Sequence, residues 1–269
     1  MSPTTPPRPI DEHRDRIRSR LASASRLLLC LDFDGTLAPI VDDPDAAAPT
    51  PENEAAVASL ATEPAVSTAI VSGRALADVR DRIDGPKTYA GNHGLELSRH
   101  GSVTVHPVAR QRMSRLEAVC ETLETVLEPI PNCRIENKRL TGTVHVRSVP
   151  ASVRSVVRRQ THAVVDRLGD GSLEVSTGKR IFEIGPSVSW DKGDAVALIA
   201  SEMPSETVPI YIGDDVTDES AFRTVEPDGI GIRVSGDEPS AASYRVDSPT
   251  AVATVLNWLD SVGVDLLES

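Results

Sequence analysis

The hydrophobic and polar positions of this chain follow two different rhythms. Residues 27–33 form an apolar run interrupted only by Asp32, and residues 66–71 form a second, mostly apolar segment. Both are typical of strands buried on both faces of a parallel sheet. A helical stretch follows each run, and Thr50 and Pro51 predict the start of the first helix as its N-cap and its first-turn proline. The first third of the chain therefore predicts a β-α-β-α unit of a parallel sheet with helices on its faces.

After Gly91 the rhythm changes to paired strand-like segments that alternate with single helices. This order is typical of an α+β layer, so we expect an inserted domain over residues 94–185 and a core domain over 1–93 and 186–269, with residues 1–9 disordered. The expected strands are 27–33, 66–71, 134–137, 143–147, 172–176, 180–184, 208–213 and 229–234, with a hairpin at 95–106. The expected helices are 10–24, 51–61, 74–83, 108–127, 151–168, 191–201, 218–225 and 250–262.

Composition narrows the class of protein. The formal net charge of −12 argues against binding to nucleic acid, which requires a basic face. Three cysteines without a C-x-x-C spacing argue against a disulfide framework and against a zinc site. No signal peptide and no apolar run long enough to cross a bilayer is present, so we expect a cytoplasmic protein without membrane contacts. We also expect a monomer.

The strongest chemical signal is the segment Asp32-Phe-Asp34-Gly-Thr, which closes the first apolar run. Side chains two positions apart in an extended segment share a face, and open α/β sheets bind ligands at the carboxyl ends of their strands. Two crowded carboxylates require a cation, and Mg²⁺ prefers oxygen ligands. One carboxylate can then attack phosphorus while the other transfers a proton. A calcium loop is disfavoured because a strand precedes the pair and glycine follows it directly.

Three later segments also place polar groups at strand ends or helix starts. Ser72 and the backbone amides after it can form a phosphate cradle at the start of a helix. Lys192 also begins a helix, where the dipole disfavours a cation unless an anion lies opposite. Acidic residues crowd positions 214–219 after another apolar run, which again indicates a cation nearby.

In this order, the four segments resemble the four motifs of the haloacid dehalogenase-like (HAD) phosphohydrolases. They read DFDGTL at 32–37, SGR at 72–74, DKGD at 191–194 and GDDVTDE at 213–219. The resemblance implies an α/β fold with a Rossmann-like core and a parallel sheet. The insertion between the second and third motifs has the position of a C2-type cap, which would cover the site and recognise the leaving group.

The resemblance also implies roles for individual residues. Asp32 would be the nucleophile and Asp34 the general acid and base, while Ser72 and Lys192 would bind the transferring phosphoryl group. Mg²⁺ would be held by the Asp32 carboxylate, the Asp34 backbone carbonyl and Asp214. Asp215 and Asp218 would be a further ligand or would orient water and Lys192, and their order stays open.

Within that superfamily, the insertion resembles the trehalose-6-phosphate phosphatases. The matching points are Gly-x-His-Gly at 91–94, the segment 138–147 and the Gly-Lys…Glu-x-x-Pro segment at 178–186. The chain departs from the usual pattern at Val146, often Tyr, and at Gly185, usually Arg. The residues implied to contact or frame the substrate are Arg74, His93, Lys138, His145, Arg147 and Glu183.

We therefore expect a magnesium-dependent phosphoric monoester hydrolase that converts trehalose 6-phosphate to trehalose and phosphate through an aspartyl-phosphate on Asp32. The alternative is a HAD phosphatase for another sugar or osmolyte phosphate, such as sucrose phosphate, mannosylglycerate phosphate or glucosylglycerol phosphate. A phosphomutase is a further alternative, because the same aspartyl-phosphate could pass its phosphoryl group to a second sugar. A non-catalytic sugar-phosphate sensor or regulatory subunit of a synthase ranks last, since both Asp32 and Asp34 are retained.

Overall fold

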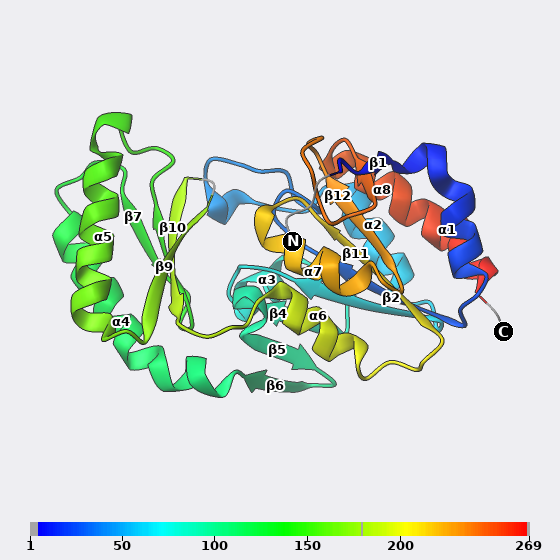
Figure 1. Cartoon of the computed structure of the whole chain (residues 1–269), viewed down its shortest axis with the longest axis horizontal. Coiled ribbons are helices and arrows are strands. Elements are labelled where there is room, and N and C mark those ends of the chain that lie inside the picture. The colour runs from blue at the N-terminus through cyan, green and yellow to red at the C-terminus, as the bar shows by residue number, and fades with distance from the viewer. Residues whose placement is uncertain (1–4, 179, 268–269) are drawn as a thin grey trace. The chain divides into compact units, whose positions relative to one another are not determined.

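The computed structural model describes residues 5–178 and 180–267 (Figure 1). The chain forms two compact units, one of Met1–Val103 with Trp190–Ser269 and one of Thr104–Ser189. The first unit contains the parallel sheet and the second is the insertion, so the α/β core with an inserted α+β domain is confirmed.

In the described residues, a nine-stranded sheet with the order β1-β13-β12-β11-β2-β3-β4-β5-β6 forms the first unit. The strands from β1 to β4 in this order pair in parallel, and β5 pairs with β4 antiparallel. Their bounds are β1 Arg8–Pro9, β2 Arg26–Leu31, β3 Val66–Val71, β4 Thr88–Gly91, β5 Glu96–Arg99, β6 Ser102–Val105, β11 Thr207–Gly213, β12 Ile230–Val234 and β13 Tyr244–Val246.

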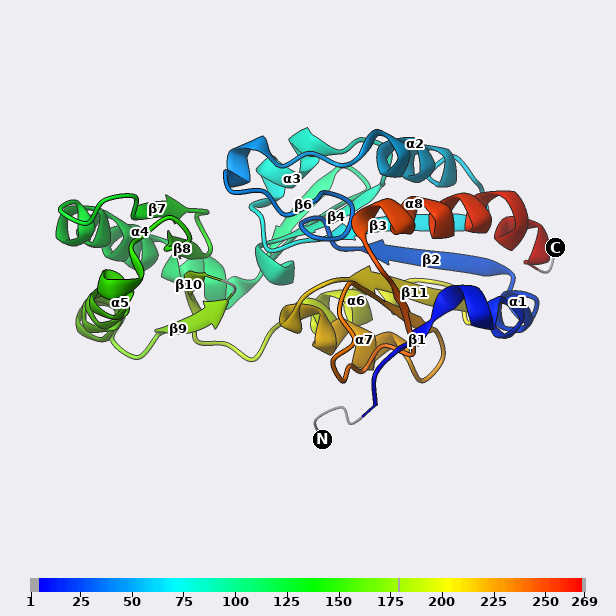
Figure 2. The ribbon, with the colours of Figure 1, turned by 90° about the horizontal axis from the view of Figure 1, so that it is seen from above.

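Helices cover both faces of this sheet (Figure 2). Along β2, Leu27, Leu29 and Leu31 pack into the cluster shared with α1, α2, α3 and α8, whereas Leu28 and Cys30 pack into the cluster shared with α6 and α7. The continuous apolar run thus reflects a strand buried on both faces, as predicted. The helix bounds are α1 Arg14–Leu21, α2 Pro51–Leu60, α3 Leu76–Arg82, α6 Lys192–Ala200, α7 Glu219–Val225 and α8 Pro249–Trp258.

The position of β2 decides where the chemistry can lie. It pairs with β11 on one side and with β3 on the other. The chain continues from β2 to β3 towards one edge of the sheet and from β11 to β12 towards the other. Such a switch point leaves a crevice at the carboxyl ends of the strands, where open α/β sheets bind ligands. Three of the four predicted motifs follow the ends of β11, β2 and β3, and the remaining one lies at the start of α6.

Two predictions about the first unit are wrong. The hairpin expected in the insertion extends the core sheet, because β5 pairs with β4, so the domain boundary lies at 103/104 rather than 93/94 and the second lies at 189/190. His100 and Gly101 both have positive φ at the tip, as a tight hairpin requires. Residues 1–9 are not wholly disordered, because Arg8–Pro9 pair with β13; residues 1–4 lie outside the described part.

The second unit is a four-stranded antiparallel sheet in the order β7-β8-β10-β9, within the described residues. Val144, Phe182 and Ile184 on alternate positions pack against the two helices of this unit. The opposite face carries the residues between them, so it is polar. The bounds are β7 Arg134–Asn137, β8 Gly142–His145, β9 Leu173–Gly178, β10 Ile181–Pro186, α4 Pro107–Leu127 and α5 Arg154–Gly169.

Short helical turns complete the fold. They are Ile10–His13, Pro44–Ala46, Asn92–Gly94, Ala151–Val153, Val216–Asp218 and Val264–Leu266, with one π-turn at Leu259–Gly263. Among the described residues, no helix has the length and apolar character that crossing a membrane requires.

Candidate active site

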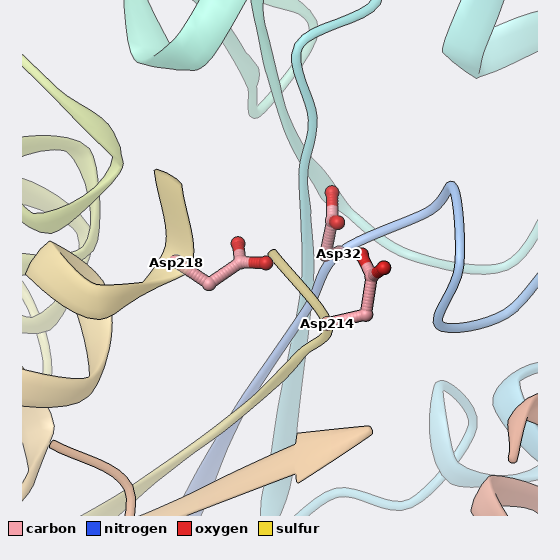
Figure 3. A group of neighbouring side chains, drawn as sticks. All are labelled: Asp32, Asp214 and Asp218. Atoms are coloured by element: carbon pink, nitrogen blue, oxygen red, sulfur yellow. The ribbon is translucent and has the colours of Figure 1, made fainter. Parts of the chain in front are cut away.

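Three carboxylates meet at the carboxyl edge of the core sheet (Figure 3). Asp32 follows β2, Asp214 follows β11, and Asp218 ends the short turn before α7. One oxygen of each lies within 4.8 Å of the others, and Asp32 is only 4% exposed while Asp218 is fully buried. The backbone amide of Asp32 donates to the Ile212 carbonyl at 2.9 Å, which fixes the two strand ends side by side.

Lys192 joins two of these carboxylates. Its Nζ lies 2.8 Å from Asp32 Oδ1 and 2.7 Å from Asp218 Oδ1. Asp191 caps helix α6 by accepting from the amides of Gly193 and Asp194, which places Lys192 in the first turn. Burial alone would lower the pKa of Lys192, but Asp218 and Asp32 outweigh it and raise the pKa, so the buried ammonium stays charged.

Of the two acids that bind Lys192, Asp218 accepts further hydrogen bonds from other donors. It accepts from the Tyr211 hydroxyl at 2.6 Å and from the Asp215 amide at 2.8 Å, in addition to Lys192. Burial opposes its ionisation, yet Lys192 and these donors hold its pKa below the ordinary value. In the structure, Asp218 therefore contacts Lys192, and the backbone amide of Asp215 donates to Asp218.

Asp32 lies in the opposite electrostatic situation. Burial raises its pKa well above the ordinary value, the charges of Asp218 and Asp214 raise it further, and Lys192 only partly compensates. Three carboxylates and the ammonium group of Lys192 thus lie together at this edge of the sheet. A divalent cation with oxygen ligands fits that donor set.

Gly35 shapes the same site. Its φ of +80° is in the region that favours glycine, and any side chain at this position would overlap the carboxyl group of Asp214. The turn after β2 therefore leaves room for the Asp214 carboxylate against the backbone that follows Asp34. This packing fits the expectation that Asp32, Asp34 and Asp214 contribute oxygens to one cation.

The second motif lies at the adjacent strand end. Ser72 follows β3 and is buried, and its hydroxyl accepts from the Arg74 amide at 3.2 Å. The Arg74 guanidinium binds Asp34 through two parallel contacts, Nε to Oδ2 and Nη2 to Oδ1, both of 2.7 Å. The fold thus brings Asp34 and Arg74 together, although 40 positions separate them.

The Asn92–Gly94 turn holds His93 against the second motif. Asn92 and His93 both have positive φ, a conformation that L-residues adopt only where the surroundings impose it. The turn is fixed because the amides of Asn92 and His93 donate to the carbonyls of Arg74 and Ser72, at 2.7 and 2.9 Å. The His93 ring consequently fills the space where a side chain on Gly73 would lie.

Glu96 is a residue that the sequence did not indicate. It is 5% exposed on β5, and its Oε1 accepts from the Leu76 amide at 2.7 Å and from the Asn92 side-chain amide at 2.6 Å. It therefore ties the strained turn to the start of α3. The only sequence signal is an acidic residue between two leucines that are themselves buried, Leu95 and Leu97.

The second unit gathers its predicted polar residues on the sheet face that is not packed against α4 and α5. His145 Nε2 lies 2.8 Å from Glu136 Oε2, and Lys138 Nζ lies 3.4 Å from Glu183 Oε1. Burial opposes ionisation of Glu136, but the hydrogen bond with His145 and the charge of Lys138 lower its pKa. The sequence analysis did not indicate Glu136. It lies two positions before Lys138, and in an extended segment this spacing places both side chains on the same face.

The prediction that His145 and Arg147 share a strand is wrong. Strand β8 ends at His145, because the chain turns after it and the Val149 amide donates to the Val146 carbonyl. The Arg147 carbonyl instead accepts from the Arg154 guanidinium at 3.1 Å. Lys179, in the predicted Gly-Lys segment, lies outside the described residues.

Comparison with known proteins agrees with this geometry. The family model described as trehalose-phosphatase matches residues 30–250, which include all four motifs and the inserted unit. The chain belongs to the trehalose-phosphatase family. A trehalose-phosphate phosphatase of Mycobacterium ulcerans is 39% identical over 240 residues, covering 86% of this chain and 60% of that protein.

Solved structures show the same fold for this trehalose-phosphatase family member. A protein described as related to trehalose-6-phosphate phosphatase has a TM-score of 0.79 at 24% identity, covering 88% of this chain and 99% of that one. The C-terminal domain of the Candida albicans trehalose-6-phosphate phosphatase also has a TM-score of 0.79, at 22% identity over 97% of this chain and 99% of that one. The chain spans about 60% of the length of the curated relative from M. ulcerans.

The Glu96 contacts lead to a prediction about the stability of the core. Glu96→Ala should reduce the free energy of unfolding by about 2–4 kcal/mol, because two buried N–H donors lose a charged acceptor. Glu96→Gln keeps an Oε1 acceptor and should lose less than half of that amount. Chemical denaturation of both variants measures the difference; an alanine variant as stable as the glutamine variant would contradict the anchoring role.

Proposed function

We propose that this chain is a phosphatase that hydrolyses trehalose 6-phosphate to trehalose and inorganic phosphate. The observation that carries the proposal is the buried Asp32–Lys192–Asp218 cluster beside Asp214. Several carboxylates at a strand end can bind a cation, and a fixed cation and ammonium group are what phosphoryl transfer requires. Membership of the trehalose-phosphatase family supports the sugar.

In the first step, a carboxylate oxygen of Asp32 attacks phosphorus and the bond from phosphorus to the sugar 6-oxygen breaks. Lys192 holds the Asp32 carboxylate in place by binding its Oδ1, and its positive charge offsets the negative charge at the site. The Asp34 carboxyl group gives a proton to the leaving 6-oxygen, which departs as the trehalose hydroxyl. The product on the enzyme is a phosphorylated Asp32.

In the second step, water attacks the phosphorus of phosphorylated Asp32. Asp34 takes a proton from this water, so inorganic phosphate leaves and Asp32 returns as a carboxylate. The Ser72 hydroxyl accepts its bond from the Arg74 amide, which leaves its proton to be donated to a phosphoryl oxygen. Asp32, Asp34, Ser72 and Lys192 thus each have a role, and Asp34 acts in both steps.

Magnesium is the cation that this donor set suits best. Asp32, Asp214 and the backbone carbonyl of Asp34 would hold it, and oxygen ligands alone are what Mg²⁺ prefers. When bound, the ion neutralises charge on the transferring phosphoryl group. We assign Asp218 to the Lys192 pair and not to the ion, because three of the four lone-pair positions of its carboxylate already accept hydrogen bonds.

The polar face of the inserted unit supports recognition of a disaccharide. Glu136, Thr143 and Glu183 lie opposite one another across β7, β8 and β10, with His145 and Lys138 paired to the two acids. Paired acids and bases offer both donors and acceptors to sugar hydroxyls, at little cost in net charge. We propose that His145, Lys138 and Glu183 contact the sugar together with Glu136, while Arg147 and His93 frame it.

The function is tested by measuring phosphate release from a panel of substrates with Mg²⁺. Trehalose 6-phosphate should be hydrolysed with the highest kcat/KM, ahead of sucrose 6-phosphate, mannosyl-3-phosphoglycerate and glucose 6-phosphate. Asp32→Asn should abolish turnover, because the amide cannot form the phosphorylated intermediate. Isosteric replacement of Asp32 keeps the fold, so the same preparation should remain folded by circular dichroism.

Other outcomes of this panel distinguish the rival activities. Preferred hydrolysis of another substrate would contradict the trehalose assignment while retaining the phosphatase. Formation of a sugar bisphosphate in place of free phosphate would indicate a phosphomutase. No turnover of any substrate would favour a regulatory role.

The sugar-binding role of the inserted unit gives a second prediction. His145→Ala should lower kcat/KM for trehalose 6-phosphate by about 10- to 100-fold, since one hydrogen bond with a charged partner contributes about 1.5–3 kcal/mol. The loss with p-nitrophenyl phosphate, which has no sugar, should be much smaller. His162→Ala, a histidine exposed on α5, is the matched control and should not change either value. Equal losses with both substrates would count against a sugar contact.

A further inference from the structure

The pair between Arg74 and Asp34 is too well fixed to be incidental. Arg74 grips both oxygens of Asp34 at 2.7 Å, and bidentate pairs of this kind fix orientation as well as distance. The Arg74 side chain is 11% exposed and that of Asp34 is 37% exposed. The arginine is therefore the covered partner, and the acid is the partner that remains accessible.

Arg74 is in turn held from its other side. Its Nη1 donates to Asp78 Oδ2 at 2.8 Å, its Nη2 donates to the Pro44 carbonyl at 2.9 Å, and its guanidinium lies 5.3 Å from the centroid of the buried Phe33 ring. Every nitrogen of the group thus has a protein acceptor. A guanidinium fixed in this way is a rigid hydrogen-bond donor that orients its partners and not a mobile cation.

This hydrogen-bond network continues along helix α3. Arg82 Nε donates to Asp78 Oδ1 at 2.8 Å, and Arg82 Nη1 donates to the carbonyl of Asp45 at 3.1 Å. Asp78 thus lies between two arginines, one that reaches Asp34 and one that does not. Both arginines hold the 44–47 segment, so the two differ mainly in the contact with Asp34.

We propose that Arg74 is a positioning residue that acts through Asp34, in place of the direct substrate contact expected from the sequence. The inference rests on the proposed phosphatase activity. Two of the four lone-pair positions of the Asp34 carboxylate accept from Arg74, and the remaining ones stay available for proton transfer to the leaving oxygen. The guanidinium keeps this carboxyl group in the orientation that proton transfer requires.

Leaving-group dependence separates this role from phosphate binding. A sugar alkoxide needs a proton as it leaves, whereas p-nitrophenolate departs without one. Loss of the Asp34 orientation therefore slows only substrates with poor leaving groups. A direct contact with the phosphoryl group would affect all substrates equally, because they share that group. The parameter kcat/KM isolates this step, since it includes no event after the first phosphorus–oxygen bond breaks.

The deciding variant is Arg74→Lys, which keeps the charge but cannot grip both carboxylate oxygens. We expect kcat/KM to fall by about 100-fold with trehalose 6-phosphate and by roughly threefold or less with p-nitrophenyl phosphate, in line with the usual contribution of a general acid. Phenyl phosphate, whose leaving group is poorer than p-nitrophenolate, should show an intermediate loss. Equal losses with all three substrates would overturn the proposal.

The matched control is Arg82→Lys, because Arg82 ends helix α3, which begins just after Arg74, and it shares Asp78 with Arg74 without contacting Asp34. Its effect should not depend on the leaving group, and thermal unfolding of both variants shows whether they are equally destabilised. If Arg82→Lys reproduced the pattern of Arg74→Lys, the effect would come from the helix and not from Asp34, and the proposal would fail.

A double-mutant cycle tests the route through Asp34. Asp34→Asn alone should show the same leaving-group dependence, and Arg74→Lys added to it should cost little more, because residues that act as one unit are not additive. Additive losses would assign Arg74 an independent role and overturn the proposal. If the wild type hydrolysed the two aryl phosphates but not trehalose 6-phosphate, the sugar assignment alone would fail, since the aryl pair still measures the Arg74 effect.

Discussion

The structure depends on one buried ammonium group that bridges two carboxylates. Lys192 contacts Asp32 and Asp218, and all three are shielded from water. Removing a charge from such a group would leave its partner buried without compensation, which is costly. Asp214 adds a third carboxylate to the site. Such a group of oxygen donors suits a divalent cation, and the bound cation would in turn attract a phosphate.

The fold supplies this arrangement from residues far apart in the chain. Neighbouring parallel strands end at the same edge, so β2, β3 and β11 deliver Asp32, Ser72 and Asp214 to one place, and the capped start of α6 adds Lys192. Around them lies a shell of fixed groups: Tyr211 on Asp218, Glu96 under the Asn92–Gly94 turn, and Arg74 on Asp34. Phosphoryl transfer depends on such fixed electrostatics more than on covalent chemistry.

The sequence predicted the fold layers, and it indicated the residues that we propose carry the chemistry. Long apolar runs located β2, β3 and β11, and the motifs located Asp32, Asp34, Ser72, Lys192 and Asp214. What the sequence could not predict was pairing between distant elements. The sequence of the hairpin after β4 does not indicate which sheet it joins, and short strands such as β1 and β13 have too few residues for a periodic pattern. No local pattern indicates that Glu96 accepts from Asn92 or that Arg74 binds Asp34. These are tertiary contacts that only the folded chain defines.

Calorimetric titration with Mg²⁺ tests most directly whether the three-carboxylate group of Asp32, Asp214 and Asp218 binds a cation. The wild type should bind one Mg²⁺ per chain, and Asp214→Asn should bind it at least about tenfold more weakly, because it removes a ligand oxygen's charge. Asp247→Asn, whose exposed carboxylate pairs with Arg245 and is not part of the three-carboxylate group, should bind Mg²⁺ as the wild type does. A wild type that bound no Mg²⁺, or an Asp214→Asn variant that bound it equally well, would contradict the account.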